Sequence, residues 1–140
     1  MASRSAPIVD TGAVSDTQAA LDRVVAEFVE HTAHVRGAVL GSADGHPLSA
    51  RLDAVPTDAA TVAAMAAATA GLATQLVRVA TKASAADSHI RGDGGQVWVL
   101  DVARAATLTV FTTEHANPAM VVGAARRAID RLVEVLSAAE

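Results

Sequence analysis

The sequence has no cysteine and no tyrosine, and its aromatic residues are one tryptophan and two phenylalanines, Trp98, Phe28 and Phe111. Without cysteine there is no disulfide framework, no thiolate zinc site and no cysteine nucleophile. The net charge of -4 and the scarcity of aromatics also argue against nucleic-acid binding, which needs a clustered basic face and bases stacked on aromatic rings. We therefore expect no nucleic-acid partner.

Long uninterrupted apolar runs are missing as well. No stretch reaches about 18 apolar residues without a polar or charged interruption, and the N-terminus lacks the apolar core of a signal peptide. We therefore expect a cytoplasmic protein without membrane insertion. The 140 residues are 51% hydrophobic and 19% charged, which is typical of one globular domain. We expect a flexible leader at residues 1–14 and a single domain at residues 15–140.

Two segments have the apolar spacing of an amphipathic helix with one buried stripe. The first begins at a capping box, in which Ser15 and Gln18 satisfy each other's backbone, and runs to about Thr32. The last begins at Asn117, a favoured cap, with Pro118 at the first helical position. Their predicted buried residues are Leu21, Val24, Val25, Phe28 and Val29 in the first helix, and Val121, Val122, Ala125, Ile129, Leu132, Val133 and Leu136 in the last.

Between these helices, β-forming runs alternate with turn residues and one long Ala-rich segment. Asp44-Gly45 predicts a two-residue hairpin turn, and Asp93-Gly94-Gly95 predicts a second turn. Predicted strands span 35–42, 47–52, 87–92, 96–102 and 108–113. The order α-β-β-α-β-β-β-α, with short links between strands, predicts one five-stranded antiparallel sheet in an α/β (α+β) fold. The first and last helices share one face of this sheet, and the middle helix covers the other.

The middle helix, predicted from an N-cap at Thr57 or Asp58 to about Ser84, is apolar all round. We expect its larger residues to rest on the sheet, namely Val62, Met65, Thr69, Leu72, Leu76 and Val79. The opposite row is made of small residues: Ala60, Ala64, Ala67, Gly71 and Thr74. A second copy of the chain could cover this row, because small residues allow two helices to approach closely. Alternatively, alanine simply fills a solvent face, although Gly71 would then destabilise the helix without return.

Several local sequences, in this order along the chain, resemble the roadblock/LC7 family, which includes dynein light chains and bacterial MglB-like proteins. The resemblance covers about residues 17–136 and is carried by Val35-Arg36-Gly37-Ala38-Val39-Leu40, Ser42-Ala43-Asp44-Gly45-His46-Pro47-Leu48, Gly71-Leu72-Ala73, Gly94-Gly95-Gln96-Val97-Trp98-Val99, Leu108-Thr109-Val110-Phe111 and Asn117-Pro118.

This resemblance implies a non-enzymatic homodimer whose sheets join at their third strands, with the middle helices meeting at the two-fold axis. The strand residues at that edge would be Ser88, His89, Ile90 and Arg91. The actinobacterial type is typically encoded beside a sensor kinase-like protein and a small Ras-like GTPase. Regulation or scaffolding of such a GTPase is therefore the implied function.

Other constellations are weaker. His31 and His34 lie three residues apart, but no cysteine or carboxylate completes a metal-ligand set, so no metal or other cofactor is expected. There is no Gly-x-Ser-x-Gly nucleophile elbow, and the glycines at 92–95 lack the Lys-Ser/Thr of a phosphate loop. Arg126, Arg127 and Arg131 form a basic strip that is either a solvated face or a docking site. The alternative function is a PAS- or profilin-like ligand-sensing domain, which needs an internal cavity.

Overall fold

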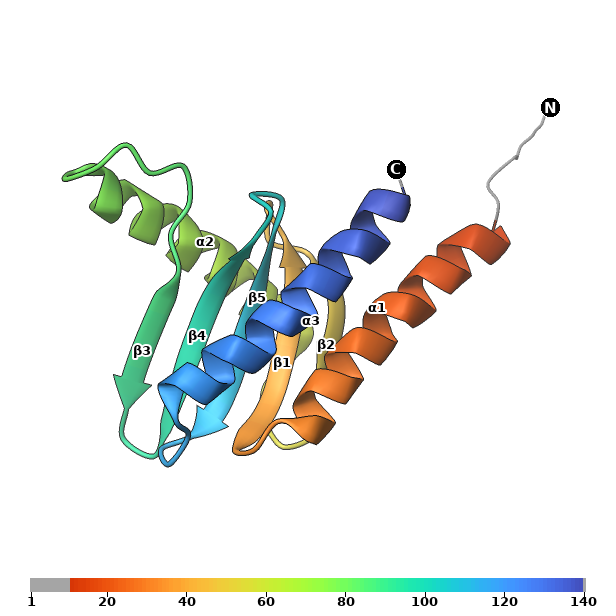
Figure 1. Ribbon diagram of the computed structural model, residues 1–140, viewed down its shortest axis with the longest axis horizontal. Helices are drawn as coiled ribbons and strands as arrows, with labels where there is room; N and C mark the ends of the chain where they lie inside the picture. The colour runs from red at the N-terminus through yellow and green to blue at the C-terminus, as the bar shows by residue number, and fades with distance from the viewer. Residues whose placement is uncertain (1–10, 140) are drawn as a thin grey trace.

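The computed structural model describes residues 11–139 and shows the predicted α-β-β-α-β-β-β-α order (Figure 1). All five strands form one antiparallel sheet in the order β2-β1-β5-β4-β3, which confirms the predicted fold class. The elements are α1 (Thr11–His31), β1 (Val35–Ser42), β2 (Pro47–Arg51), α2 (Ala59–Arg78), β3 (Ser88–Gly92), β4 (Gly95–Val102), β5 (Ala106–Thr113) and α3 (Pro118–Ala138).

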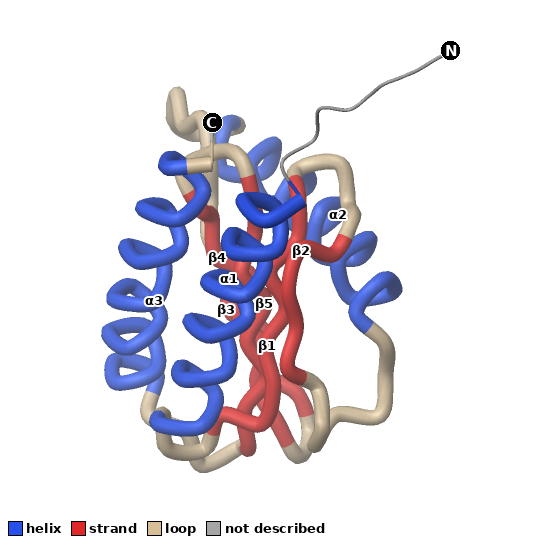
Figure 2. Tube along the Cα trace, turned by 90° about the vertical axis from the view of Figure 1, so that its right-hand side faces the viewer, coloured by secondary structure: helices blue, strands red, loops and turns tan. Residues whose placement is uncertain are grey.

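Helices α1 and α3 lie side by side on one face of the sheet, and α2 lies alone on the other, as predicted (Figure 2). The α1/α3 side holds the main core, which contains Phe28, Trp98 and the fully buried Leu40, Leu100, Leu108 and Leu132. Burying large apolar side chains is the dominant favourable term in folding, so most of the stability resides on this side.

The α2 side of the sheet has a much thinner core. Its buried apolar cluster is Val39, Val62 and Ala63, with Leu52, Ala59 and Phe111 partly buried beside it, and Ala66 and Val99 are also buried on this side. The helix comes close to β1 at Gly41, which has no side chain. A Cβ added there would lie 3.2 Å from the Cβ of Ala63. Beneath α2, the buried hydroxyls of Thr107 and Thr109 find no hydrogen-bond partner among the described residues. Each such group is destabilising, since it has given up water without a replacement.

Two helix boundaries differ from the predicted ones. Helix α1 begins at Thr11, so the predicted cap at Ser15 lies inside it and Thr11–Val14 extend the domain; the rest of the predicted leader lies outside the described residues. Helix α2 ends at Arg78 rather than near Ser84. The hydroxyl of Thr81 donates to the carbonyl of Val77, and such side-chain bonding competes with continued helix.

The predicted caps of α2 and α3 are confirmed. Asp58 accepts a hydrogen bond from the backbone N–H of Thr61 at 2.8 Å. Asn117 accepts from the N–H groups of Ala119 and Met120, and Pro118 follows it at the first helical position. Both side chains satisfy N–H groups that the first helical turn leaves without partners.

The first hairpin turn is one residue longer than predicted. The N–H of Ser42 donates to the carbonyl of His46 at 2.8 Å, which leaves three residues in the loop rather than Asp44 and Gly45 alone. Gly45 has a φ of +90°, the left-handed conformation that a three-residue hairpin loop places at this position. The second turn is shorter than predicted, because Gly92 pairs with Gly95 and the strand resumes there.

Candidate functional site: two interaction surfaces

The outer side of α2 is the largest departure from the sequence prediction. Met65, Leu72 and Leu76, which were expected to rest on the sheet, are 65%, 68% and 72% exposed. Val79 is exposed as well, Thr69 is half-buried, and only Val62 of the predicted stripe is buried. The sheet contact is made by Val62, Ala63 and Ala66. The prediction was wrong because a helix that is apolar on every side has no single stripe, and small residues fit the close approach at Gly41.

The small-residue row of α2 lies on the flank that points toward the first hairpin turn. Ala60, Ala64 and Gly71 are exposed, whereas Ala67 and Thr74 are half-buried. A Cβ added at Gly45 would lie 3.3 Å from the Cα of Ala64 and 3.6 Å from the Cβ of Ala67. Part of this row is therefore in contact with the chain's own turn, and the rest is open.

Strand β3 forms one edge of the sheet and pairs only with β4. Ser88 is half-buried, and His89, Ile90 and Arg91 are exposed. Ile90 pairs with Val97, which pairs with Phe111, so these three residues form a row across β3, β4 and β5 on the α2 side. None of the three is fully buried. We call Met65, Leu72, Leu76, Val79, Ile90, Val97 and Phe111 the α2-side apolar surface.

On the other face of β3, a stacked pair holds the edge strand in place. The ring of His89 stacks on Trp98 with centroids 4.2 Å apart and planes 6° apart. The amide nitrogen of Gln96 donates to the carbonyls of Glu114 and Ala116, so its Oε1 accepts from Nε2 of His89 at 2.7 Å. These contacts fix the otherwise exposed β3 against the start of α3, so its free backbone edge has a defined orientation.

The resolved pKa shifts lie at the first hairpin turn, at the cap of α2 and at an exposed ion-pair cluster, all outside the α2-side apolar surface. The backbone N–H of Thr61 lowers the pKa of Asp58 below its ordinary 3.8. Hydrogen bonds to Asp53 and Glu30 raise the pKa of Arg51. The described residues contain no group of three His, Cys, Asp or Glu side chains arranged to hold a metal ion. Nothing here converges as a catalytic set does.

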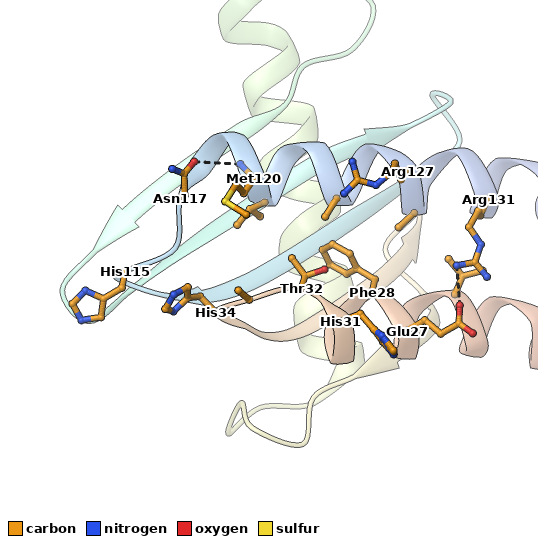
Figure 3. Close-up of a pocket in the computed structure, with 15 residues that line it drawn as sticks. Glu27, Phe28, His31, Thr32, His34, His115, Asn117, Met120, Arg127 and Arg131 are labelled. Carbon is orange, nitrogen blue, oxygen red and sulfur yellow. Dashed lines mark hydrogen bonds and ion pairs between the residues drawn. The ribbon is translucent and has the colours of Figure 1, made fainter.

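A second surface is an open groove between the C-terminal half of α1 and the N-terminal half of α3, which we call the α1–α3 groove (Figure 3). Its volume is about 570 Å³. It is lined by Val24, Glu27, Phe28, His31, Thr32, Ala33, His34, His115, Asn117, Met120, Val121, Ala124, Arg127, Ala128 and Arg131. Of the predicted basic strip, Arg127 and Arg131 line this groove together with His31 and His34, whereas Arg126 lies outside it and pairs with Asp87.

Helix α2 is also the one described helix that is long and apolar enough to cross a membrane. In the fold it lies against the sheet instead, in contact with all five strands. Its exposed apolar residues therefore belong to the surface of a folded domain, and length and composition alone are weak evidence for a membrane span.

A family model for the Roadblock/LC7 domain matches residues 21–112, which is more than half of the chain. The chain belongs to the Roadblock/LC7 family. The match runs from α1 through most of β5 and includes α2 and β3. A search of curated protein sequences finds no match.

Solved structures share this Roadblock/LC7 fold. A structure titled MglB with tetrameric arrangement has a TM-score of 0.80 at 20% identity, covering 89% of this chain and 93% of that one. A Roadblock/LC7 domain from Streptomyces avermitilis has a TM-score of 0.76 at 21% identity, covering 83% and 97%. Acanthamoeba castellanii profilin IA is more distant, with a TM-score of 0.54 at 14% identity, covering 81% and 96%. At these identities the likeness shows a common fold.

Proposed function

We propose that this chain is a non-enzymatic, dimeric interaction module that regulates or scaffolds a small Ras-like GTPase in the cytoplasm. Membership of the Roadblock/LC7 family and the shared fold with MglB support this role. A sensor kinase-like protein is a further expected partner of the actinobacterial type. A ligand-sensing role is less well supported, because the α1–α3 groove and a smaller hollow beside α2 are both open to solvent rather than enclosed.

The observation that carries the proposal is the α2-side apolar surface beside an unpaired sheet edge. Exposed apolar patches of this kind on a small domain mark interaction sites, and an open strand edge is a template for pairing with another chain. A two-fold axis beside β3 would pair the two edges antiparallel and bring the two α2 helices together. The proposed contact residues are Ala60, Ala64, Ala67, Gly71, Thr74, Ser88, His89, Ile90 and Arg91, together with Met65, Leu72 and Leu76.

Leu72→Glu tests the dimer. Leu72 is 68% exposed, so a charge there is tolerated in a monomer but is buried without a partner in the proposed dimer. Light scattering should give a dimer mass for the wild type and a monomer mass for Leu72→Glu, with unchanged circular dichroism. Val14→Glu is the matched control, because Val14 is 60% exposed on α1, on the opposite side of the sheet and outside the α1–α3 groove.

A monomeric wild-type chain, or a dimer that Leu72→Glu leaves intact, would contradict the proposed interface. Co-sedimentation with lipid vesicles tests whether the apolar surface of α2 instead inserts into a bilayer. Binding to vesicles by a monomeric wild type would likewise overturn the dimer.

The GTPase partner is tested by capture from the native lysate, with the chain immobilised and either GDP or a non-hydrolysable GTP analogue added. A Ras-like GTPase should be retained with one nucleotide in preference to the other, because a regulator must bind the two states differently. Retention should be lost with Leu72→Glu and kept with Val14→Glu. Equal retention with both nucleotides would argue for tethering rather than regulation.

A further inference from the structure

The α1–α3 groove has an apolar floor. Val24, Phe28, Val121 and Ala128 are buried at its base, and Met120 stands 67% exposed at its edge. Its volume of about 570 Å³ lies in the range of sites that bind ligands. A trough between two antiparallel helices suits a peptide that inserts a few apolar side chains.

The rim of this groove is cationic, although the whole chain carries a net charge of -4. Arg127 and Arg131 both project from α3, and the only carboxylate in the lining is that of Glu27. Arg131 forms an ion pair with Glu27 at 2.9 Å, whereas Arg127 has no ion-pair partner among the described residues. The guanidinium of Arg127 therefore lies at the rim of the groove and can pair with a carboxylate of a bound partner.

Two histidines extend the polar rim at the opposite end. Figure 3 shows His34 and His115 at one end of the groove, the pair of Glu27 and Arg131 at the other, and Phe28 between them. The ring centroids of His34 and His115 are 6.5 Å apart, and His115 also contacts Glu114 at 3.6 Å. Imidazoles donate hydrogen bonds to carboxylates, and since His115 already lies beside Glu114, His34 is the imidazole that can donate to a partner's carboxylate at this end.

We propose that the α1–α3 groove binds a partner peptide in which one or two apolar side chains are flanked by Asp or Glu. The apolar side chains fill the space over Phe28 and beside Met120, and a carboxylate pairs with Arg127. The groove is on the face of the sheet opposite α2, so such a peptide does not compete with the proposed dimer or with a GTPase bound on that side. The module then has two independent docking surfaces.

Selection from a phage library of random peptides of about twelve residues against the immobilised full chain tests this inference. Enriched peptides should carry Asp or Glu beside Leu, Ile, Met, Phe or Trp. Failure to enrich any peptide, or enrichment of peptides without carboxylates, would overturn the proposal. Chemical shifts in an ¹⁵N-labelled chain should move mainly at residues 24–34 and 115–131; changes confined to α2 and β3 would also overturn it.

Charge reversal then locates the carboxylate contact. Arg127→Glu should weaken a selected, fluorescein-labelled peptide by about tenfold or more, because it replaces attraction with repulsion in a partly desolvated groove. Arg23→Glu makes the same change of net charge on an exposed part of α1 outside the groove and should leave affinity within about twofold. Equal losses of affinity in the two variants would mean that the peptide binds through non-specific charge attraction, which would overturn the proposed site. None of these readouts depends on dimerisation or on a GTPase.

Discussion

The two faces of the sheet differ in how completely this chain covers them. On the α1/α3 side, side chains of the two helices, such as Phe28, pack against leucines and Trp98 of the sheet and form the main core. On the α2 side, one helix packs a few small apolar residues against the sheet and covers two threonine hydroxyls that have no partner among the described residues, while its larger apolar residues remain exposed. The first face therefore supplies most of the stability of the monomer, whereas the second leaves large apolar side chains in contact with solvent.

Removing a large core side chain should give the largest effect and should separate the two faces most clearly. Leu132 is fully buried, so Leu132→Ala should lower the free energy of unfolding by about 2–5 kcal/mol, through lost burial and the cavity left behind. Leu72→Ala, at a dilution where the chain is monomeric, should change it by less than about 0.5 kcal/mol. Urea denaturation measures both. Comparable losses would mean that α2 is packed far more tightly than its exposure indicates.

Enlarging the contact between α2 and β1 should have the next largest effect. A Cβ added at Gly41 would lie 3.2 Å from the Cβ of Ala63. Gly41→Val should therefore push the helix away and lower the free energy of unfolding by about 1–3 kcal/mol. Gly71→Ala is the matched control, because a Cβ there meets nothing within 4 Å and alanine favours a helix by about 1 kcal/mol. A stabilised Gly41→Val variant would show that α2 can move away freely.

Two threonines of β5 should respond with opposite signs. Thr109→Val removes a buried hydroxyl that has no partner and should stabilise the chain by about 1 kcal/mol. Thr112→Val, on the α1/α3 side, removes a hydroxyl that donates to the carbonyl of Thr113 at 2.8 Å and should destabilise it slightly. Thermal unfolding compares the two. A loss of stability in both variants would mean that Thr109 is hydrogen-bonded after all.

The smallest expected difference concerns the caps of α2 and α3 at low pH. The N–H of Thr61 lowers the pKa of Asp58 below 3.8, so this carboxylate stabilises the fold above that pH, and the contribution is lost as the pH falls through its folded-state pKa. Asp58→Asn should reduce the loss of unfolding free energy as the pH falls below about 4. Asn117→Asp should add a similar pH dependence at α3. Acid titration followed by circular dichroism checks both, and an unchanged pH dependence in both variants would contradict the capping account.

The sequence was sufficient to predict the element order, the sheet and the division of helices between its faces. Those features follow from local signals, such as the cap at Asn117 and the β-forming run at 97–100, and from the single apolar stripes of the outer helices. The three-residue loop at Gly45 could not be predicted from Asp44-Gly45 alone, because its length depends on which residues of β1 and β2 pair.

The candidate surfaces were harder to predict. Periodicity cannot orient α2, because Leu72 and Ala63 belong to rows of similar regularity, and only the close approach at Gly41 selects the smaller one. The α1–α3 groove depends on long-range packing that brings His34 beside His115 and Arg131 beside Glu27. Spacing along either helix alone carries no sign of it.

The antiparallel arrangement of α1 and α3 has a practical consequence for handling the protein. Thr11 and Ala138 lie toward the same end of the helical layer, away from the two loops that hold His34 and His115 and on the side of the sheet opposite α2 (Figure 1). A fluorescent protein or an affinity tag joined directly to Thr11 or Ala138 would project from this shared corner. Fusions there leave both surfaces accessible to solvent, so the same tagged chain can serve for immobilisation, imaging and each of the binding experiments.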